Sequence, residues 1–125
     1  SGAKEVLGIN PKSARRLKGL DSARRIVDKD GIYSADVVLV PLEDGDRTLA
    51  LKKAKKKVIT FDLNPLSRTA QTADITIVDN TTRAMKLLVT ACKKKKAKSS
   101  YNNKKVLSES ISEIRKNLQR RAKLA

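Results

Sequence analysis

Three short runs of aliphatic and β-branched residues stand out in the middle of the sequence. They span Val37–Val40, Val58–Phe61 and Ile75–Val78, and acidic, amide, hydroxyl, Gly or Pro residues follow each of them. The first run and the start of the second are continuously apolar, as is typical of strands buried on both faces of a parallel sheet. The pattern therefore predicts three strands that each end in a polar cluster.

Segments with helical periodicity follow two of these runs. Asp46 to Lys57 begins with a capping Asp and places Leu51 and Ala54 on one face, although no Gly is available to end it. Arg83 to about Lys95 carries a stripe that we expect to face the core, made of Ala84, Leu87, Leu88 and Ala91. Strands that alternate with helices predict an α/β fold, with a parallel sheet that is covered by helices on both faces.

The two ends of the chain have other patterns. Glu5–Ile9 predicts a further strand, and Asn10–Ala35 predicts a basic, turn-rich loop. Val106–Leu124 predicts an amphipathic helix that packs on the domain or on a second subunit, with Leu107, Ile111, Ile114 and Leu118 on its apolar side. The expected organisation is an α/β domain at 1–95, a linker at 96–105 and a C-terminal helix at 106–125.

Composition narrows the class of protein. Hydrophobic residues make up 39% of the 125 residues and aromatic residues only 2%, which predicts an aliphatic core. No run approaches the roughly 18 apolar residues of a membrane span, and no leader pattern is visible, so we expect a cytoplasmic protein. There is no His, and Cys92 has no partner thiol. Disulfide frameworks, the usual zinc sites and His-based catalysis are therefore excluded for these residues.

The formal charge of +16 is concentrated in the C-terminal part. Residues 93–125 contain twelve Lys or Arg against Glu109 and Glu113, so this part contributes +10 of the total. Such a charge attracts nucleotides and nucleic acids alike. A basic nucleic-acid-binding module therefore stays an alternative function, although few aromatic residues are available to stack on bases. The lysines of residues 52–57 are most simply read as a solvated helix face.

The polar clusters after the first two runs each contain a carboxylate that could bind a ligand. Glu43 and Asp44 after the first run could hold Mg²⁺, or could form a turn that caps the next helix. Asp62-Leu63-Asn64 after the second run could bind ribose hydroxyls and a base edge, or could form an Asx turn before Pro65. The residues alone leave both alternatives open.

The remaining polar residues suit a polyphosphate. Arg68 and Thr69 offer a guanidinium and a hydroxyl to phosphate oxygens. Asn80 and Thr81 begin a helix whose free N–H groups favour an anion, although simple capping explains them as well. Each signal is weak alone. Ligands of open α/β sheets bind outside the carboxyl ends of the strands, and these clusters follow three successive strands.

At these same residues the sequence resembles a known family. VVLVPLEDGDRT and VITFDLNPLSRTAQTADITIVDN are similar to the archaeal phosphopantothenate synthetases, also called 4-phosphopantoate–β-alanine ligases. The similarity extends through LGINP, GLDSARRIVDKDGI and the C-terminal helix, so it covers nearly the whole chain. It corresponds to the C-terminal half of that family.

The resemblance implies a homodimeric, ATP-dependent ligase of coenzyme A biosynthesis with a Rossmann-like core. The expected reaction joins (R)-4-phosphopantoate to β-alanine through an acyl-adenylate and releases AMP and pyrophosphate. Basic groups and Mg²⁺ then matter more than a nucleophilic side chain. The ATP contacts implied by the resemblance are Asp62, Leu63, Asn64, Arg68, Thr69, Asn80 and Thr81. Substrate contacts are expected at Arg24, Asp46 and Arg47, and Mg²⁺ contacts at Glu43 and Asp44.

Three departures from the family limit what the resemblance implies. Family members are about twice as long, and further ATP contacts come from an N-terminal half. We therefore expect this chain to be one part of the enzyme, with little or no ligase activity alone. The family also has Gly near Lys55 and an acidic residue near Leu49, and its connection matching Pro11–Gly19 is shorter and less basic.

Overall fold

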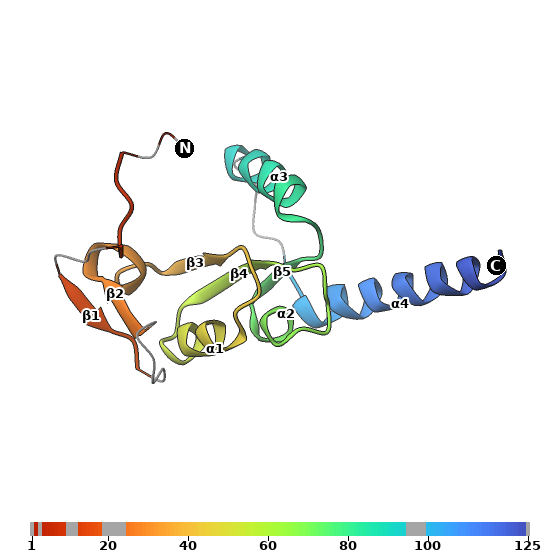
Figure 1. The fold of residues 1–125 in the computed structure, drawn as a ribbon, viewed down its shortest axis with the longest axis horizontal. Coiled ribbons are helices and arrows are strands. Elements are labelled where there is room, and N and C mark those ends of the chain that lie inside the picture. Colours follow the sequence, from red (N-terminus) through yellow and green to blue (C-terminus); the bar gives the residue numbers. More distant parts are fainter. Residues whose placement is uncertain (1, 3, 10–12, 19–24, 95–99, 125) are drawn as a thin grey trace.

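The computed structural model describes residues 2, 4–9, 13–18, 25–94 and 100–124. Strands β3, β4 and β5 form a parallel sheet in that order, beside an antiparallel hairpin of β1 and β2 (Figure 1). The strands are β1 (Ala14–Arg16), β2 (Ile26–Asp28), β3 (Val37–Val40), β4 (Lys57–Phe61) and β5 (Ile75–Ile77). The helices are η2 (Lys29–Tyr33, a π-helix), α1 (Gly45–Lys53), α2 (Arg68–Thr72), α3 (Thr81–Lys93) and α4 (Asn103–Ala122). The predicted α/β class, with a parallel sheet and a C-terminal helix, is confirmed.

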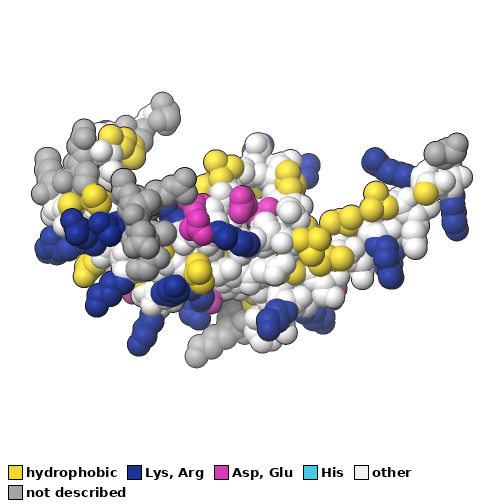
Figure 2. Space-filling model, turned by 60° about the horizontal axis from the view of Figure 1, so that its bottom comes forward, with side chains coloured by type: hydrophobic (Ala, Val, Ile, Leu, Met, Phe, Trp, Pro, Cys, Tyr) yellow, Lys and Arg dark blue, Asp and Glu magenta, His cyan; other side chains and the backbone are white. Residues whose placement is uncertain are grey.

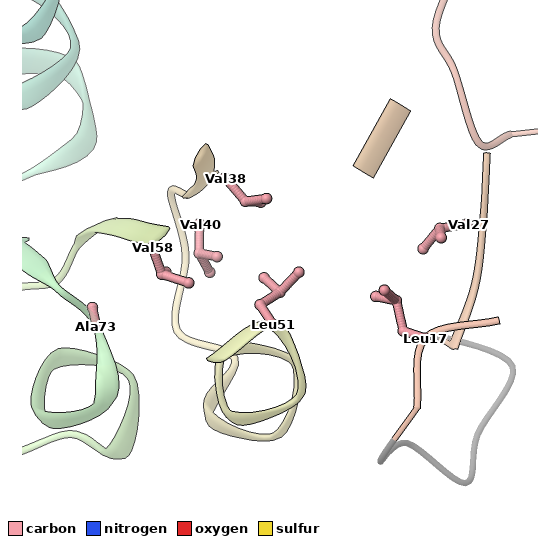
Figure 3. Packing of buried hydrophobic residues seen from close by; sticks show 7 residues of the cluster. All are labelled: Leu17, Val27, Val38, Val40, Leu51, Val58 and Ala73. Carbon is pink, nitrogen blue, oxygen red and sulfur yellow. The ribbon is translucent and has the colours of Figure 1, made fainter. Parts of the chain in front are cut away.

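The core lies between the sheet, α1 and the hairpin. Val38 pairs with Val58 across β3 and β4, so both side chains point to the same face of the sheet. Leu51 of α1 is fully buried and lies between these valines and Leu17 of the hairpin (Figure 3). Burial of one Leu or Val side chain stabilises a fold by about 1.5–3 kcal/mol, so this cluster joins the hairpin to the sheet.

The opposite face of the sheet is half-exposed. Leu39, Ile59 and Ile77 lie on it and are only partly buried, and Val37 at its edge is 54% exposed. α3 stands away from the sheet, on the side opposite α1 and α2 (Figure 1). Helix α3 therefore does not form the helical layer expected on this second face of the sheet.

The apolar stripe predicted on α3 does not face the core, so that prediction was wrong. Only Ala84 of the stripe is buried, whereas Leu87 is 61% exposed. The spacing of apolar residues indicates that the helix has an apolar side. It does not indicate which other part of the protein packs against that side.

The C-terminal helix is fixed to the domain only at its start. Leu107 is buried, and α4 contacts α2 and β5 before it extends away from the rest of the molecule (Figure 1). Side chains near its first residue hold it: Asn103 Oδ1 accepts from Thr76 N (2.8 Å), and Asn103 Nδ2 donates to Ala70 O (2.9 Å). α4 begins three residues before the predicted Val106.

The first 35 residues differ most from the prediction. Glu5–Ile9 does not form a strand, because Gly8 adopts a positive φ of 90° in a turn. The predicted loop at Asn10–Ala35 instead contains β1 and β2, and η2 replaces the turn expected at Asp30-Gly31. β1 is a short run of exposed residues, so no hydrophobic pattern marks it.

Helix α1 differs from its prediction at both ends. Asp44, rather than Asp46, caps it, because the Asp44 carboxylate accepts from Arg47 N. The helix ends at Lys53 and leaves Ala54 exposed. Lys55, with a φ of 60°, takes the left-handed position that Gly usually occupies at a helix end.

Candidate functional site

The polar cluster after β3 is organised around Asp44. Its carboxylate caps α1 by accepting from Arg47 N (3.0 Å), and the Arg47 guanidinium lies 3.7 Å from the same carboxylate. The backbone N–H of Asp44 donates to Thr69 Oγ1 (2.9 Å), which belongs to the cluster after β4. A buried threonine thus joins two of the clusters that the sequence placed at one edge.

The cluster after β4 is a tight turn closed by Asp62. The Asp62 carboxylate is largely buried and accepts from the backbone N–H of Asn64 (2.8 Å) and from the hydroxyl of Ser67. Asn64 Oδ1 in turn accepts from Leu66 N (2.9 Å). The Asx turn considered from the sequence is therefore present. Carboxylate oxygens accept more than one bond each, so the turn does not use up the acceptor capacity of Asp62.

Arg68 lies across the beginning of α1. Its guanidinium is ion-paired with Asp46 and is largely exposed. A Cβ at Gly45 would come within 2.7 Å of Arg68 Nε, so Gly45 leaves the space that this side chain occupies. The arrangement brings an exposed cation to the same edge as Asp44 and Asp62.

The cluster after β5 begins α3. Asn80 Oδ1 caps the helix by accepting from Arg83 N (2.9 Å). The Arg83 side chain donates to the Asp79 carboxylate, and these bonds, together with the bond from Asn80 N, hold the pKa of Asp79 below its ordinary value. Thr81 Oγ1 donates to Pro41 O (3.3 Å), which connects the start of α3 to the end of β3.

The structure thus brings most of the predicted residues together at one edge. Hydrogen bonds link residues 43–48 with 68–69, and residue 81 with 41. Leu63 is 69% exposed and Asn64 is exposed beside it. Arg24 lies outside the described residues. The individual ligand roles of these residues stay predictions.

Two residues lie in the predicted clusters, but the sequence analysis assigned them no role of their own. Ser67 caps α2 by accepting from Ala70 N (2.9 Å) and also donates to Asp62. Asp79 orients Arg83, four residues later on α3. The Ser-x-x-Ala spacing before a short helix and the acidic–basic pair at i and i+4 are the signals that could have found them.

Arg47 also lines a neighbouring hollow of about 280 Å³. The other walls are mostly aliphatic and include Leu7, Ile9, Ile26 and Ile32. A guanidinium in the wall of a largely aliphatic hollow suits a small branched anion, although the buried Asp28 also lines this hollow.

For a metal ion, the described residues offer few ligands. They contain no group of three or more His, Cys, Asp or Glu side chains that could hold one. Mg²⁺ commonly uses one or two carboxylates together with substrate phosphates and water. Glu43 and Asp44 could supply that smaller donor set, although the Asp44 carboxylate also caps α1 and pairs with Arg47.

Comparison with known sequences identifies the family. The sequence model described as phosphopantothenate/pantothenate synthetase matches residues 1–117. The chain belongs to this family. It is 50% identical to the 4-phosphopantoate–β-alanine ligase of Methanosarcina mazei and 50% identical to that of Thermococcus kodakarensis, over 94% of its own length in each case. The corresponding ligase of Thermococcus onnurineus is 49% identical over 91% of the chain.

The match covers only part of these synthetases. The chain spans about half the length of the curated relatives it matches, 49% and 48% for the first two. Within the described residues, no helix is long and apolar enough to cross a membrane. The family assignment agrees with the resemblance seen in the sequence.

Proposed function

We propose that this chain supplies the nucleotide-binding edge of an ATP-dependent ligase that joins (R)-4-phosphopantoate to β-alanine. The 50% identity to 4-phosphopantoate–β-alanine ligases carries the proposal. The hydrogen-bonded edge formed by residues 43–48, 62–69 and 79–81 supports it, because it lies at the carboxyl ends of three parallel strands.

In the proposed complex, ATP lies across the ends of β4 and β5. Its ribose would accept and donate hydrogen bonds at Asp62 and Asn64, and its phosphates would lie at the first turn of α3 and against Arg68. The free N–H groups of that turn and the guanidinium are suited to phosphate oxygens. Glu43 or Asp44 would hold Mg²⁺, which would offset the negative charge of the phosphates.

The proposed reaction has two steps. A carboxylate oxygen of phosphopantoate attacks the α-phosphorus of ATP, which forms the acyl-adenylate and releases pyrophosphate. The amine of β-alanine then attacks the acyl carbon, AMP leaves and the amine loses a proton. Arg68 would neutralise charge that develops on the phosphates, so the protein acts by positioning and electrostatics.

The aliphatic hollow beside Arg47 is the proposed place for phosphopantoate. The paired methyl groups of that substrate match walls made of Leu7, Ile26 and Ile32, and an anionic end of the substrate would reach Arg47. We further propose a cytoplasmic homodimer as the working enzyme.

Thermal shift with ATP and Mg²⁺ tests the nucleotide site at constant, moderate salt. At an ATP concentration of 100 times Kd, a specific site adds about 2.7 kcal/mol of stability. We expect Arg68→Ala and Asn64→Ala to remove most of this shift. Arg115→Ala, on the exposed part of α4, is the control and should preserve it.

Equal shifts in all three variants, or a shift that disappears when salt is raised, would contradict the proposal. Binding would then arise from the general positive charge of the C-terminal part. Formation of AMP from ATP, phosphopantoate and β-alanine by this chain measures the reaction itself, and we expect little or none.

A further inference from the structure

A second group of cations lies at the other end of the sheet. A hollow of about 390 Å³ there is lined by Arg16, Lys18, Lys53 and Lys56, with Tyr33 and Leu17. Lys56 precedes β4 and Asp62 follows it. Six residue steps of about 3.3 Å place roughly 20 Å between them, so the hollow is separate from the candidate ATP edge.

The lining of this hollow is one-sided in charge. It contains four cationic side chains and no carboxylate. Two neighbouring lysines instead share the Asp74 carboxylate, with Lys52 Nζ at 2.7 Å and Lys57 Nζ at 3.4 Å from its Oδ1. Within the described residues, no such ion pair is formed by Arg16, Lys18 or Lys53. The four like charges repel one another, and a polyanion would relieve that repulsion.

One of these cations is held in place. Lys56 Nζ donates to the carbonyl oxygens of Tyr33 (2.7 Å) and Ala35 (2.6 Å), and Lys56 is only partly exposed. These two backbone carbonyls fix the ammonium group of Lys56 at the wall of the hollow.

The end of α1 accounts for only part of the cluster. Lys53 lies in the last turn of α1, where a cation complements the helix dipole. Arg16 and Lys18 come from the hairpin, far from that helix in sequence, and the fold brings them to the same hollow. The favourable interaction of a cation with the helix dipole of α1 therefore does not explain why four cationic side chains line this hollow.

The hollow also contains an aromatic ring. Tyr33 is 46% exposed, and it is one of only three aromatic residues in the chain. A half-exposed ring beside several cations can stack on a base while the cations bind phosphates. The volume lies in the range of single small-molecule sites. A nucleic acid strand would need several stacking platforms in succession.

We propose that this hollow binds a nucleotide with several phosphate groups, with its base on Tyr33 and its phosphates on Arg16, Lys18, Lys53 and Lys56. It would be a second nucleotide site, about the length of the sheet away from the catalytic edge. Such a site suits an effector of the ligase rather than its substrate.

Titration of the chain with adenosine 3′,5′-bisphosphate, followed by backbone amide NMR at about 0.15 M salt, tests this site. The double variant Arg16→Ala/Lys53→Ala should weaken binding at least tenfold. Lys86→Ala/Arg115→Ala removes the same charges from exposed positions on α3 and α4, and should change Kd less than twofold. Tyr33→Leu should weaken binding by about fivefold or more, because base stacking is lost.

Equal weakening by both double variants would overturn the proposal in favour of a general field effect. Amide shifts confined to residues 62–69 and 79–81 of the unmodified chain would also overturn it, since the nucleotide would then bind only at the ATP edge. Tighter binding of an oligouridine strand that is lost in Arg16→Ala/Lys53→Ala would assign the hollow to nucleic acid instead. The shift map of the unmodified chain decides the location even if a variant folds poorly.

Discussion

Lys55 occupies a backbone conformation that a side chain disfavours. Its φ is 60°, and the bonds from Lys55 N to Lys52 O and from Lys56 N to Leu51 O form the helix-ending motif in which Gly is usual. The left-handed conformation costs a residue other than Gly about 1–2 kcal/mol. Replacement by Gly recovers only part of this energy, because Gly has more conformational entropy in the unfolded chain. We expect Lys55→Gly to stabilise the protein by about 0.5–1 kcal/mol, measured by urea unfolding.

Lys55→Ala is the matched control for this prediction. It removes the same charge but keeps the Cβ that causes the strain, so it should give no comparable gain. If both variants stabilise equally, repulsion among the lysines rather than backbone strain limits stability at this turn.

Asp74 joins the end of α1 to the sheet. Burial alone would raise the pKa of this carboxyl, but hydrogen bonds from Lys52 and from Val58 N, with the charges of Lys52 and Lys57, lower it below 3.8 overall. Because the pKa is lower in the folded state, the carboxylate stabilises the fold above about pH 4, and this contribution is lost as the pH falls through the folded-state pKa.

Asp74→Asn should therefore destabilise the protein at pH 7 by about 1–2 kcal/mol, the range for a partly exposed, charge-assisted hydrogen bond. The difference from the unmodified chain should shrink when unfolding is repeated near pH 3. A difference that is the same at both pH values would show that ionisation of Asp74 does not contribute to stability.

The elements that could be predicted from the sequence are those with local signals. Runs rich in β-branched residues mark β3, β4 and β5 in the sequence, and the N-cap residue Asn80 marks the start of α3. The β1–β2 hairpin has no such signal. Ala14–Arg16 is exposed, so it shows no hydrophobic pattern, and its extended conformation comes from pairing with β2. Glu5–Ile9 contains residues that favour a strand, but no strand among the described residues pairs with it. The positive φ of Gly8 places a turn there instead.

The attachment of α4 is another feature without a sequence signal. Asn103 accepts from Thr76 N and donates to Ala70 O and Ala73 O, so one side chain closes the edge of β5 and the end of α2. We expect Asn103→Ala to cost about 1.5–3 kcal/mol, because it leaves the part-buried N–H of Thr76 without a partner. Amide hydrogen exchange should show faster exchange at Thr76 and in the first turns of α4.

Asn102→Ala is the control for the attachment of α4. Asn102 caps the helix by accepting from Lys105 N (3.1 Å) and makes no bond to β5 among those that the structure describes. Its loss should cost about 1 kcal/mol and affect the first turn of α4 without changing exchange at Thr76. Similar exchange at Thr76 in both variants would mean that helix capping, not the Asn103 anchor, fixes α4.

At the level of the whole molecule, the position of the candidate site followed from chain order, but its internal bonding did not. Polar residues after parallel strands must meet at one edge, so residues 43–48, 62–69 and 79–81 could be placed together. The contacts that organise them depend on side-chain geometry between elements, such as Thr69 with Asp44 and Arg68 with Asp46. Periodicity within one element carries no information about such pairs.

The sequence pattern of α4 likewise does not show what covers the exposed apolar surface of this helix. Ile111, Ile114 and Leu118 form a row along the projecting helix, and Leu118 is 63% exposed (Figure 2). The homodimer proposed above would cover this row with a second copy. We therefore expect concentration-dependent association in analytical ultracentrifugation, and Ile114→Lys/Leu118→Lys should shift the chain to monomer.

Salt gives this prediction a second, independent test. α4 carries six basic residues against Glu109 and Glu113, so two copies that pack through it repel each other. Added salt screens that repulsion, and association through α4 should strengthen between about 0.05 and 0.5 M salt, whereas polyanion binding should weaken over the same range. Serine substitution at Cys92, which is exposed on α3, removes disulfide-linked dimers as an explanation. A chain that stays monomeric at all salt concentrations would show that α4 does not mediate self-association.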